Sequence, residues 1–92
     1  MYSDWSEFIL RDLLRGKARM VADRCFVLNE TSSSVRLGMS SLYQPLLDDE
    51  VVKSLNKEFQ ENINPDCKVS VEIAEQPDFL PTPIQERMMR RQ

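Results

Sequence analysis

The sequence predicts a small α+β domain in the order α-α-β-β-α-β, in which a three-stranded sheet packs against helices and a proline-rich tail follows. Two segments, 35–39 and 68–73, alternate apolar and polar residues as half-buried strands do. Because each such strand has one apolar face to cover, helices packed on one face of the sheet form a compact arrangement. Between these strands an apolar stripe at spacings of three and four predicts an amphipathic helix: Val52, Leu55, Phe59 and Ile63.

The length, composition and net charge of the chain limit the classes of protein to which it can belong. The 92 residues suit one small domain, with a compact part over 1–74 and a tail with the start of a helix over 75–92. Twelve basic and fifteen acidic residues give a net charge of −3, which opposes a nucleic-acid surface built on net charge. No apolar run approaches the roughly 18 residues of a membrane span, and no secretory signal begins the chain. We therefore expect a cytoplasmic protein without a membrane partner.

The first two predicted elements are helices. One covers about 4–14, with Asp4 as its N-cap and Glu7 as the reciprocal partner. Trp5 heads its apolar stripe, either sealing the core or serving as a binding anchor. Gly16 is expected to end this helix, because glycine adopts the left-handed conformation without a Cβ penalty. A second helix over 17–24 carries small alanines that permit close packing.

A hairpin, a helix and a strand follow. Residues 26–30 form the first predicted strand, and the polar turn 31–34 lacks Asn-Gly, which favours a loop of three to five residues. A connection over 40–45 contains Pro45, which disfavours helix at the preceding residue. Asp48 and Asp49 are N-cap candidates for a helix over 49–62. In the last strand we expect Val69, Val71 and Ile73 to face the core.

The tail has a different composition. Three prolines in residues 75–83 exclude this stretch from a central strand. Thr82, Pro83 and Gln85 then match an N-cap, a first helical residue and the partner of a capping box. Because a helix that begins there and stops at Gln92 is marginal alone, we expect the chain to continue or a partner to order this end.

No catalytic constellation is predicted. The chain has no histidine, and the serines at 32–34 have no activating base. The acids at 48–50 suit a helix cap better than a catalytic pair, and no cofactor or metal site is expected. Cys25 and Cys67 are interpreted as reduced thiols, with a disulfide as the alternative.

Two surfaces are candidates for binding. Met-rich apolar sequence with basic neighbours suits docking onto a partner, although the terminal helix could instead pack back on its own domain. The partner-binding candidates in this tail are Phe79, Leu80, Ile84, Arg87, Met88 and Arg91. A second set near the second helix is either a solvated face or an anion- or partner-facing patch: Arg15, Lys17, Arg19 and Arg24.

The order of these motifs resembles the C-terminal domain of the bacterial DNA polymerase III tau subunit. The resemblance covers nearly the whole chain and includes Leu14-x-Gly16-x-Ala18-Arg19-x-x-Ala22 after the Trp5 helix, the alternating strands, and the Thr82-Pro83 helix start. It implies a non-catalytic module that tethers the polymerase alpha subunit to the clamp loader. We expect the domain alone to be a monomer.

The alternative is a nucleic-acid-binding module, because the layout is similar to that of KH domains. KH domains clamp the nucleic-acid backbone with a Gly-x-x-Gly loop. Gly16 and Gly38, the two glycines, are too far apart in sequence to form one. What stays open is a weak electrostatic contact through the basic set near the second helix, or through Arg87, Arg90 and Arg91, that salt would weaken.

Overall fold

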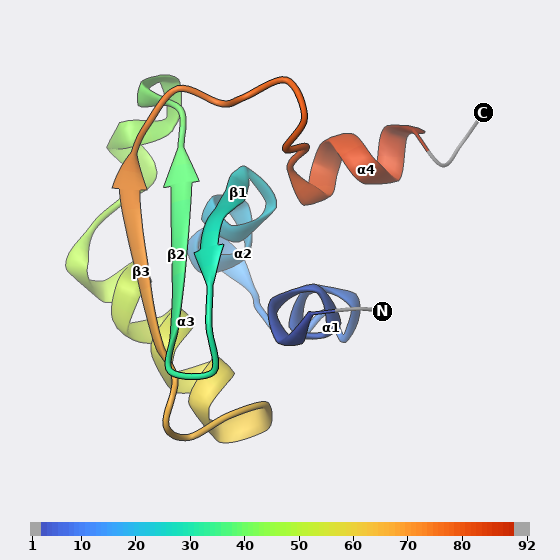
Figure 1. Cartoon of the computed structure of the whole chain (residues 1–92). Helices are drawn as coiled ribbons and strands as arrows, with labels where there is room; N and C mark the ends of the chain where they lie inside the picture. Colours follow the sequence, from blue (N-terminus) through green and yellow to red (C-terminus); the bar gives the residue numbers. More distant parts are fainter. Residues whose placement is uncertain (1–2, 90–92) are drawn as a thin grey trace.

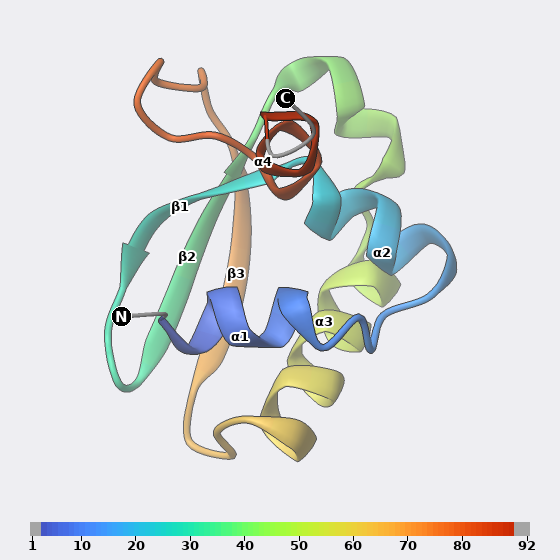
Figure 2. The ribbon, with the colours of Figure 1, turned by 90° about the vertical axis from the view of Figure 1, so that its right-hand side faces the viewer.

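The computed structural model describes residues 3–89 and confirms the α+β fold class. A three-stranded mixed sheet has the order β1-β2-β3, with β1 and β2 antiparallel and β2 and β3 parallel (Figure 1). Helices α2 and α3 lie on one side of this sheet, whereas α1 and α4 lie beside its edge strand β1 (Figure 2). The elements are α1 (Asp4–Leu10), α2 (Gly16–Asp23), β1 (Cys25–Glu30), β2 (Ser34–Met39), the 3-10 helix η1 (Ser41–Leu46), α3 (Asp49–Asn62), β3 (Lys68–Ile73) and α4 (Pro83–Met89).

The strands largely confirm the alternation in the sequence. The three apolar residues of β2, Val35, Leu37 and Met39, are fully buried, as is Val69 in β3. The prediction that Ile73 faces the core is wrong, because this side chain is 37% exposed. Asn56 of α3 bonds Val69, and Ile73 lies four residues further along β3, near the level at which α3 begins.

The first helix departs from its prediction at both ends. Its N-cap is Ser3, whose hydroxyl accepts a hydrogen bond of 3.1 Å from the Ser6 N–H, and Asp4 is already helical. The helix ends at Leu10, four residues early, and Asp12 then takes a left-handed φ of 54°. Gly16 therefore does not end α1. It begins α2 with a φ of 62°, a conformation that glycine adopts without steric penalty.

The long helix α3 has the predicted bounds and the predicted cap. The Asp48 carboxylate accepts a bond of 2.9 Å from the Val51 N–H. The buried face differs by one residue, because Val51, not Val52, is buried at a spacing of four before Leu55 and Phe59. Before α3, the predicted connection is a 3-10 helix that contains Pro45, and the Ser40 hydroxyl caps its start.

The core lies between the sheet and the helices. Trp5, Phe8 and Phe59 form an aromatic cluster with ring centroids 5.3 to 5.7 Å apart, separations typical of favourable aromatic pairs. Trp5 is 2% exposed and belongs to the core, which confirms the first of its two interpretations. Phe26 lies across from Gly38 in the sheet, and its ring occupies the space that a side chain at Gly38 would need.

Helix α3 also holds the outer edge of β3. The Asn56 amide accepts a bond from the Val69 N–H and donates one to the Val69 carbonyl, each 2.8 Å long. Gln60 donates a further bond of 2.8 Å to the Cys67 carbonyl. These side chains satisfy buried backbone groups of an edge strand that no other strand could satisfy.

Candidate protein-interaction surface

The segment between β3 and α4 is held by a compact set of hydrogen bonds. Gln76 donates from its amide nitrogen to the Leu80 carbonyl at 2.8 Å and to the Gln85 side-chain oxygen at 2.7 Å. The Leu80 N–H bonds the Pro77 carbonyl at 3.1 Å, which closes a turn with Asp78 and Phe79 at its tip. The segment therefore has a defined shape although it contains no regular element.

The start of α4 confirms the predicted capping box. The Gln85 side chain accepts a bond of 3.0 Å from the Thr82 N–H, and the Thr82 hydroxyl accepts one of 3.4 Å from the Gln85 N–H. Thr82 is buried. Pro83 is the first helical residue, a position at which a backbone N–H would have no acceptor within the helix, so proline loses nothing there. This local pattern fixes the residue at which α4 begins.

The predicted partner-binding residues lie in this segment and in α4. Phe79 is 80% exposed at the tip of the turn, and Met88 is 66% exposed on α4. Ile84 is also exposed, whereas Leu80 is half-buried. Arg87 is exposed, and its guanidinium contacts the Asp23 carboxylate of α2 at 3.0 Å. Arg91 lies outside the described residues.

A groove separates α4 from α1. It has a volume of about 400 Å³ and a floor formed by Cys25, Phe26 and Val27 at the edge of β1. Leu10 of α1, which is 54% exposed, forms part of one wall, and the prolines before and at the start of α4 form part of the other. The surface available to a partner thus includes a groove lined by apolar and charged side chains, as well as the exposed tail residues.

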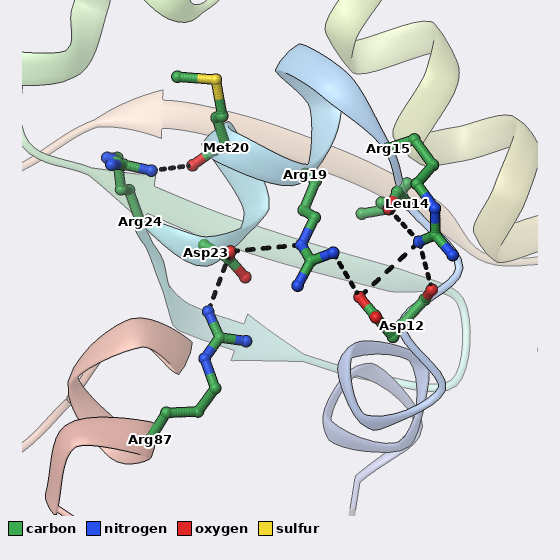
Figure 3. A network of polar contacts seen from close by, with 8 residues as sticks. All are labelled: Asp12, Leu14, Arg15, Arg19, Met20, Asp23, Arg24 and Arg87. Atoms are coloured by element: carbon green, nitrogen blue, oxygen red, sulfur yellow. Dashed lines mark hydrogen bonds and ion pairs between the residues drawn. The ribbon is translucent and has the colours of Figure 1, made fainter.

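A network of ion pairs links the helices at one end of this groove (Figure 3). Asp23 accepts contacts from Arg87 at 3.0 Å and Arg19 at 3.8 Å. Arg19 also contacts Asp12 at 3.2 Å, and Asp12 is 3.8 Å from Arg15. The side chain of Asp23 is only 15% exposed, so its two arginine partners compensate a carboxylate that has lost most of its water.

The structure brings the predicted basic set near α2 together but pairs each member. Arg15 and Arg19 share Asp12, and Lys17 bonds Asp48 at 2.8 Å. Arg24 donates to the Met20 carbonyl at 3.0 Å and lies 5.2 Å from the centroid of the Tyr43 ring. The charges of this set are therefore engaged within the domain.

The cysteines are buried free thiols, which agrees with the reduced interpretation. Burial raises the pKa of Cys25 to about 12, and burial together with the nearby carboxylates of Glu30 and Asp4 raises the pKa of Cys67. Both shifts in pKa favour the protonated thiol over the thiolate, which is the reactive form of cysteine. Over residues 3–89, no cluster of three or more acidic or cysteine side chains is placed to hold a metal ion.

Sequence reasoning missed Asp12, Asp23 and Leu10 as parts of this surface. The spacing of Arg19 and Asp23, four residues apart on one helix, was a usable signal for an ion pair. No local pattern connects Asp23 with Arg87, because the fold alone brings them together. Among the described residues, no helix is both long and apolar enough to cross a membrane.

No protein-family profile matches the chain, and neither a curated protein nor a solved structure is significantly similar to it.

Proposed function

We propose that this chain is a non-catalytic protein–protein interaction module of bacterial DNA polymerase III, acting in the cytoplasm. In this proposal it tethers the polymerase alpha subunit to the clamp loader, as the resemblance to the tau C-terminal domain implies. The order of motifs that carries the resemblance supports it. The structure adds the physical reason to expect a partner, which is the apolar surface of the C-terminal segment.

One observation carries the proposal. The C-terminal segment is ordered by its capping box and by the Arg87–Asp23 ion pair, yet it leaves Phe79, Ile84 and Met88 exposed. Ile84 and Met88 are four residues apart, so they share one face of α4. Although α4 contacts α2, this face leaves Met88 66% and Ile84 37% exposed. An exposed apolar helix face that contains methionine is a common mode of partner recognition.

The nucleic-acid alternative receives less support from the side chains. Nucleic-acid binding uses lysine and arginine side chains to neutralise phosphates, so cations that already contact carboxylates are less available for it. Arg15, Arg19 and Lys17 already contact carboxylates, and Arg87 does so as well. The proposal therefore favours a protein partner.

The test is binding of the full chain to purified alpha subunit, measured by titration calorimetry. We expect Met88→Glu to weaken binding by at least about tenfold, because it places a charge in an apolar contact. Met20→Glu, a substitution at an exposed methionine of α2, is the matched control and should change binding by less than about twofold.

A salt series with single-stranded DNA provides the contrasting measurement. We expect no detectable binding of the chain to single-stranded DNA at physiological salt, and at most weak binding at low salt. Tight DNA binding that falls steeply with salt, together with no binding to alpha, would contradict it.

A further inference from the structure

The most exposed aromatic side chain of the described residues belongs to Phe79, at the tip of the turn between Pro77 and Leu80. This turn lies in the segment that runs from the end of β3 to α4 and projects beyond the sheet (Figures 1 and 2). Exposure of a single apolar residue is common on protein surfaces and means little alone. The surroundings of Phe79 are what distinguish it.

The backbone that presents Phe79 is pre-organised. Prolines 77 and 81 flank the turn, and the Gln76 side chain ties Leu80 to Gln85 of α4. The Ala74 N–H continues the sheet by bonding the Met39 carbonyl at 3.0 Å. Little conformational entropy is therefore left to lose when a partner covers the ring, which favours tight binding.

The charged residues next to Phe79 in the sequence, within 75–82, are both acidic. Asp78 precedes the ring in the turn, and Glu75 lies three residues before Asp78. Both residues are exposed, and within residues 3–89 neither takes part in an ion pair. They differ in this from Asp12, Asp23 and Asp48, which all contact a cation.

We propose that the turn at Asp78 and Phe79 is a docking element that inserts its ring into an apolar pocket with a basic rim on a partner protein. This rests on the proposed function as an interaction module and names the kind of surface the module recognises. The ring supplies apolar area for a pocket, and the two carboxylates select a rim of lysine or arginine. Phosphate-rich partners are disfavoured, because the same carboxylates repel them.

The first test uses the alpha subunit as the probe and the full chain in calorimetry. We expect Phe79→Ala to weaken binding by at least about tenfold, as loss of an interface anchor does. Leu42→Ala is the matched control, because Leu42 is 81% exposed and belongs to η1, outside the turn, and it should change binding by less than about twofold. Unchanged circular dichroism and melting temperature show that neither variant is misfolded.

The charge part of the proposal has its own variants. Asp78→Lys should weaken binding at low salt by about tenfold, with the difference shrinking as salt rises, because screening removes the repulsion from a basic rim. Glu61→Lys on α3 makes the same change of charge at another exposed position and should have little effect. If Asp78→Lys strengthens binding, the rim is not basic and the proposal is wrong.

A second test does not depend on alpha. A photoreactive phenylalanine, p-benzoylphenylalanine, replaces Phe79 or Leu42 in cells that make the full chain, and the cross-linked residues are mapped by mass spectrometry. We expect cross-links from position 79 alone, onto an apolar surface bordered by lysine or arginine. Cross-links onto a second copy of this chain, onto nucleic acid or onto an acidic surface would overturn the proposal.

The two tests separate the docking element from the proposed function. Alpha binding that is insensitive to Phe79→Ala overturns the docking element and leaves the module's function intact. No alpha binding, with specific cross-links from position 79 onto a basic-rimmed apolar surface of another protein, supports the docking element and overturns the assignment to the polymerase. No alpha binding and no specific cross-link overturns both.

Discussion

At position 38 the Phe26 ring on the neighbouring strand leaves no room for a side chain, so glycine fits best there. A Cβ at this position would lie 2.5 Å from Cε2 and 2.8 Å from Cζ of the Phe26 ring, which is fully buried. We expect Gly38→Ala to lower the free energy of unfolding by about 1–3 kcal/mol, because the Phe26 ring must shift from its packed position to admit the methyl group. Urea denaturation followed by circular dichroism measures this loss.

The control for this prediction is a second change at the same contact. Phe26→Leu removes the ring atoms that the new methyl group meets. If the clash is the cause, the double variant Phe26→Leu/Gly38→Ala should be more stable than the sum of the two single losses predicts. Strict additivity would attribute the effect of Gly38→Ala to the backbone.

Asp48 makes stability depend on pH. Its side-chain bond to Lys17, followed by its bond from the Val51 N–H, lowers the pKa of this carboxyl below the ordinary value of 3.8. Folding thus favours the ionised form. The stabilisation is fully present above pH 3.8 and is lost as pH falls through the folded pKa.

The measurement compares melting temperatures of wild type and Asp48→Asn between pH 7 and pH 2. Asparagine is also a good N-cap, so the variant removes mainly the charge. We expect wild type to melt higher at neutral pH and the difference to disappear in acid. A difference that persists at pH 2, or that is unchanged in a Lys17→Met background, would contradict this account.

At the scale of elements, the Asn56 amide ties α3 to β3 with two hydrogen bonds. Asn56→Ala would leave the N–H and carbonyl of the buried Val69 without these partners. We expect a loss of about 1–3 kcal/mol in the free energy of unfolding, the usual consequence of an unsatisfied buried group. Asn62→Ala removes an exposed amide that bonds only within its own helix, and it should change stability by less than about 0.5 kcal/mol.

The attachment of α4 gives a second prediction for an element. Asp23→Asn weakens the pairing of α2 with Arg87, so α4 should open more often while the sheet stays intact. We expect a local loss of about 1 kcal/mol, seen as roughly fivefold faster hydrogen exchange in α4 and not in α3. Glu86→Gln, on the same helix, is the control. Equal acceleration in both helices would show global destabilisation instead.

The elements differ in how well the sequence predicted them. Helix α3 was predicted because its apolar residues repeat every three to four positions and because Asp48 is a strong N-cap. Strands β2 and β3 were predicted because their apolar residues alternate with polar ones. The end of α1 was missed because Asp12 takes a positive φ and turns the chain before Gly16. Aspartate adopts this conformation more readily than most residues other than glycine, but glycine is the stronger sequence signal. The 3-10 helix η1 was missed because it is short and buries no residue, so it leaves no periodic pattern.

At the scale of the whole molecule, the candidate surface was only partly predictable. The capping box of α4 lies within four residues and was read correctly. The ion pair between Arg87 and Asp23, and the groove that β1 forms with α1 and α4, depend on contacts between distant segments. Sequence patterns also do not show that Arg15 and Arg19 share the carboxylate of Asp12, which decides how much positive charge remains.

The reactivity of the two buried thiols can be used to measure how often the whole domain unfolds. Both are buried, and the pKa of Cys25 is raised to about 12, so the folded protein should react with a disulfide reagent at pH 8 only through unfolding. We expect labelling to be slow in buffer and to accelerate with urea along the global transition. Rapid labelling of either thiol in buffer would show local opening around it.

The parallel pairing of β2 with β3 has a consequence for the order of folding. The β1–β2 hairpin closes over a turn of a few residues, whereas Val35 meets Val69 only after the chain has passed through η1 and α3. Contacts between residues far apart in sequence form against a larger loss of chain entropy, and they form late unless local structure shortens the path. β3 is therefore expected to dock after the hairpin and α3. The turn at Phe79 is reached through β3, so the chain presents this ring in its final position only when the rest of the domain has folded.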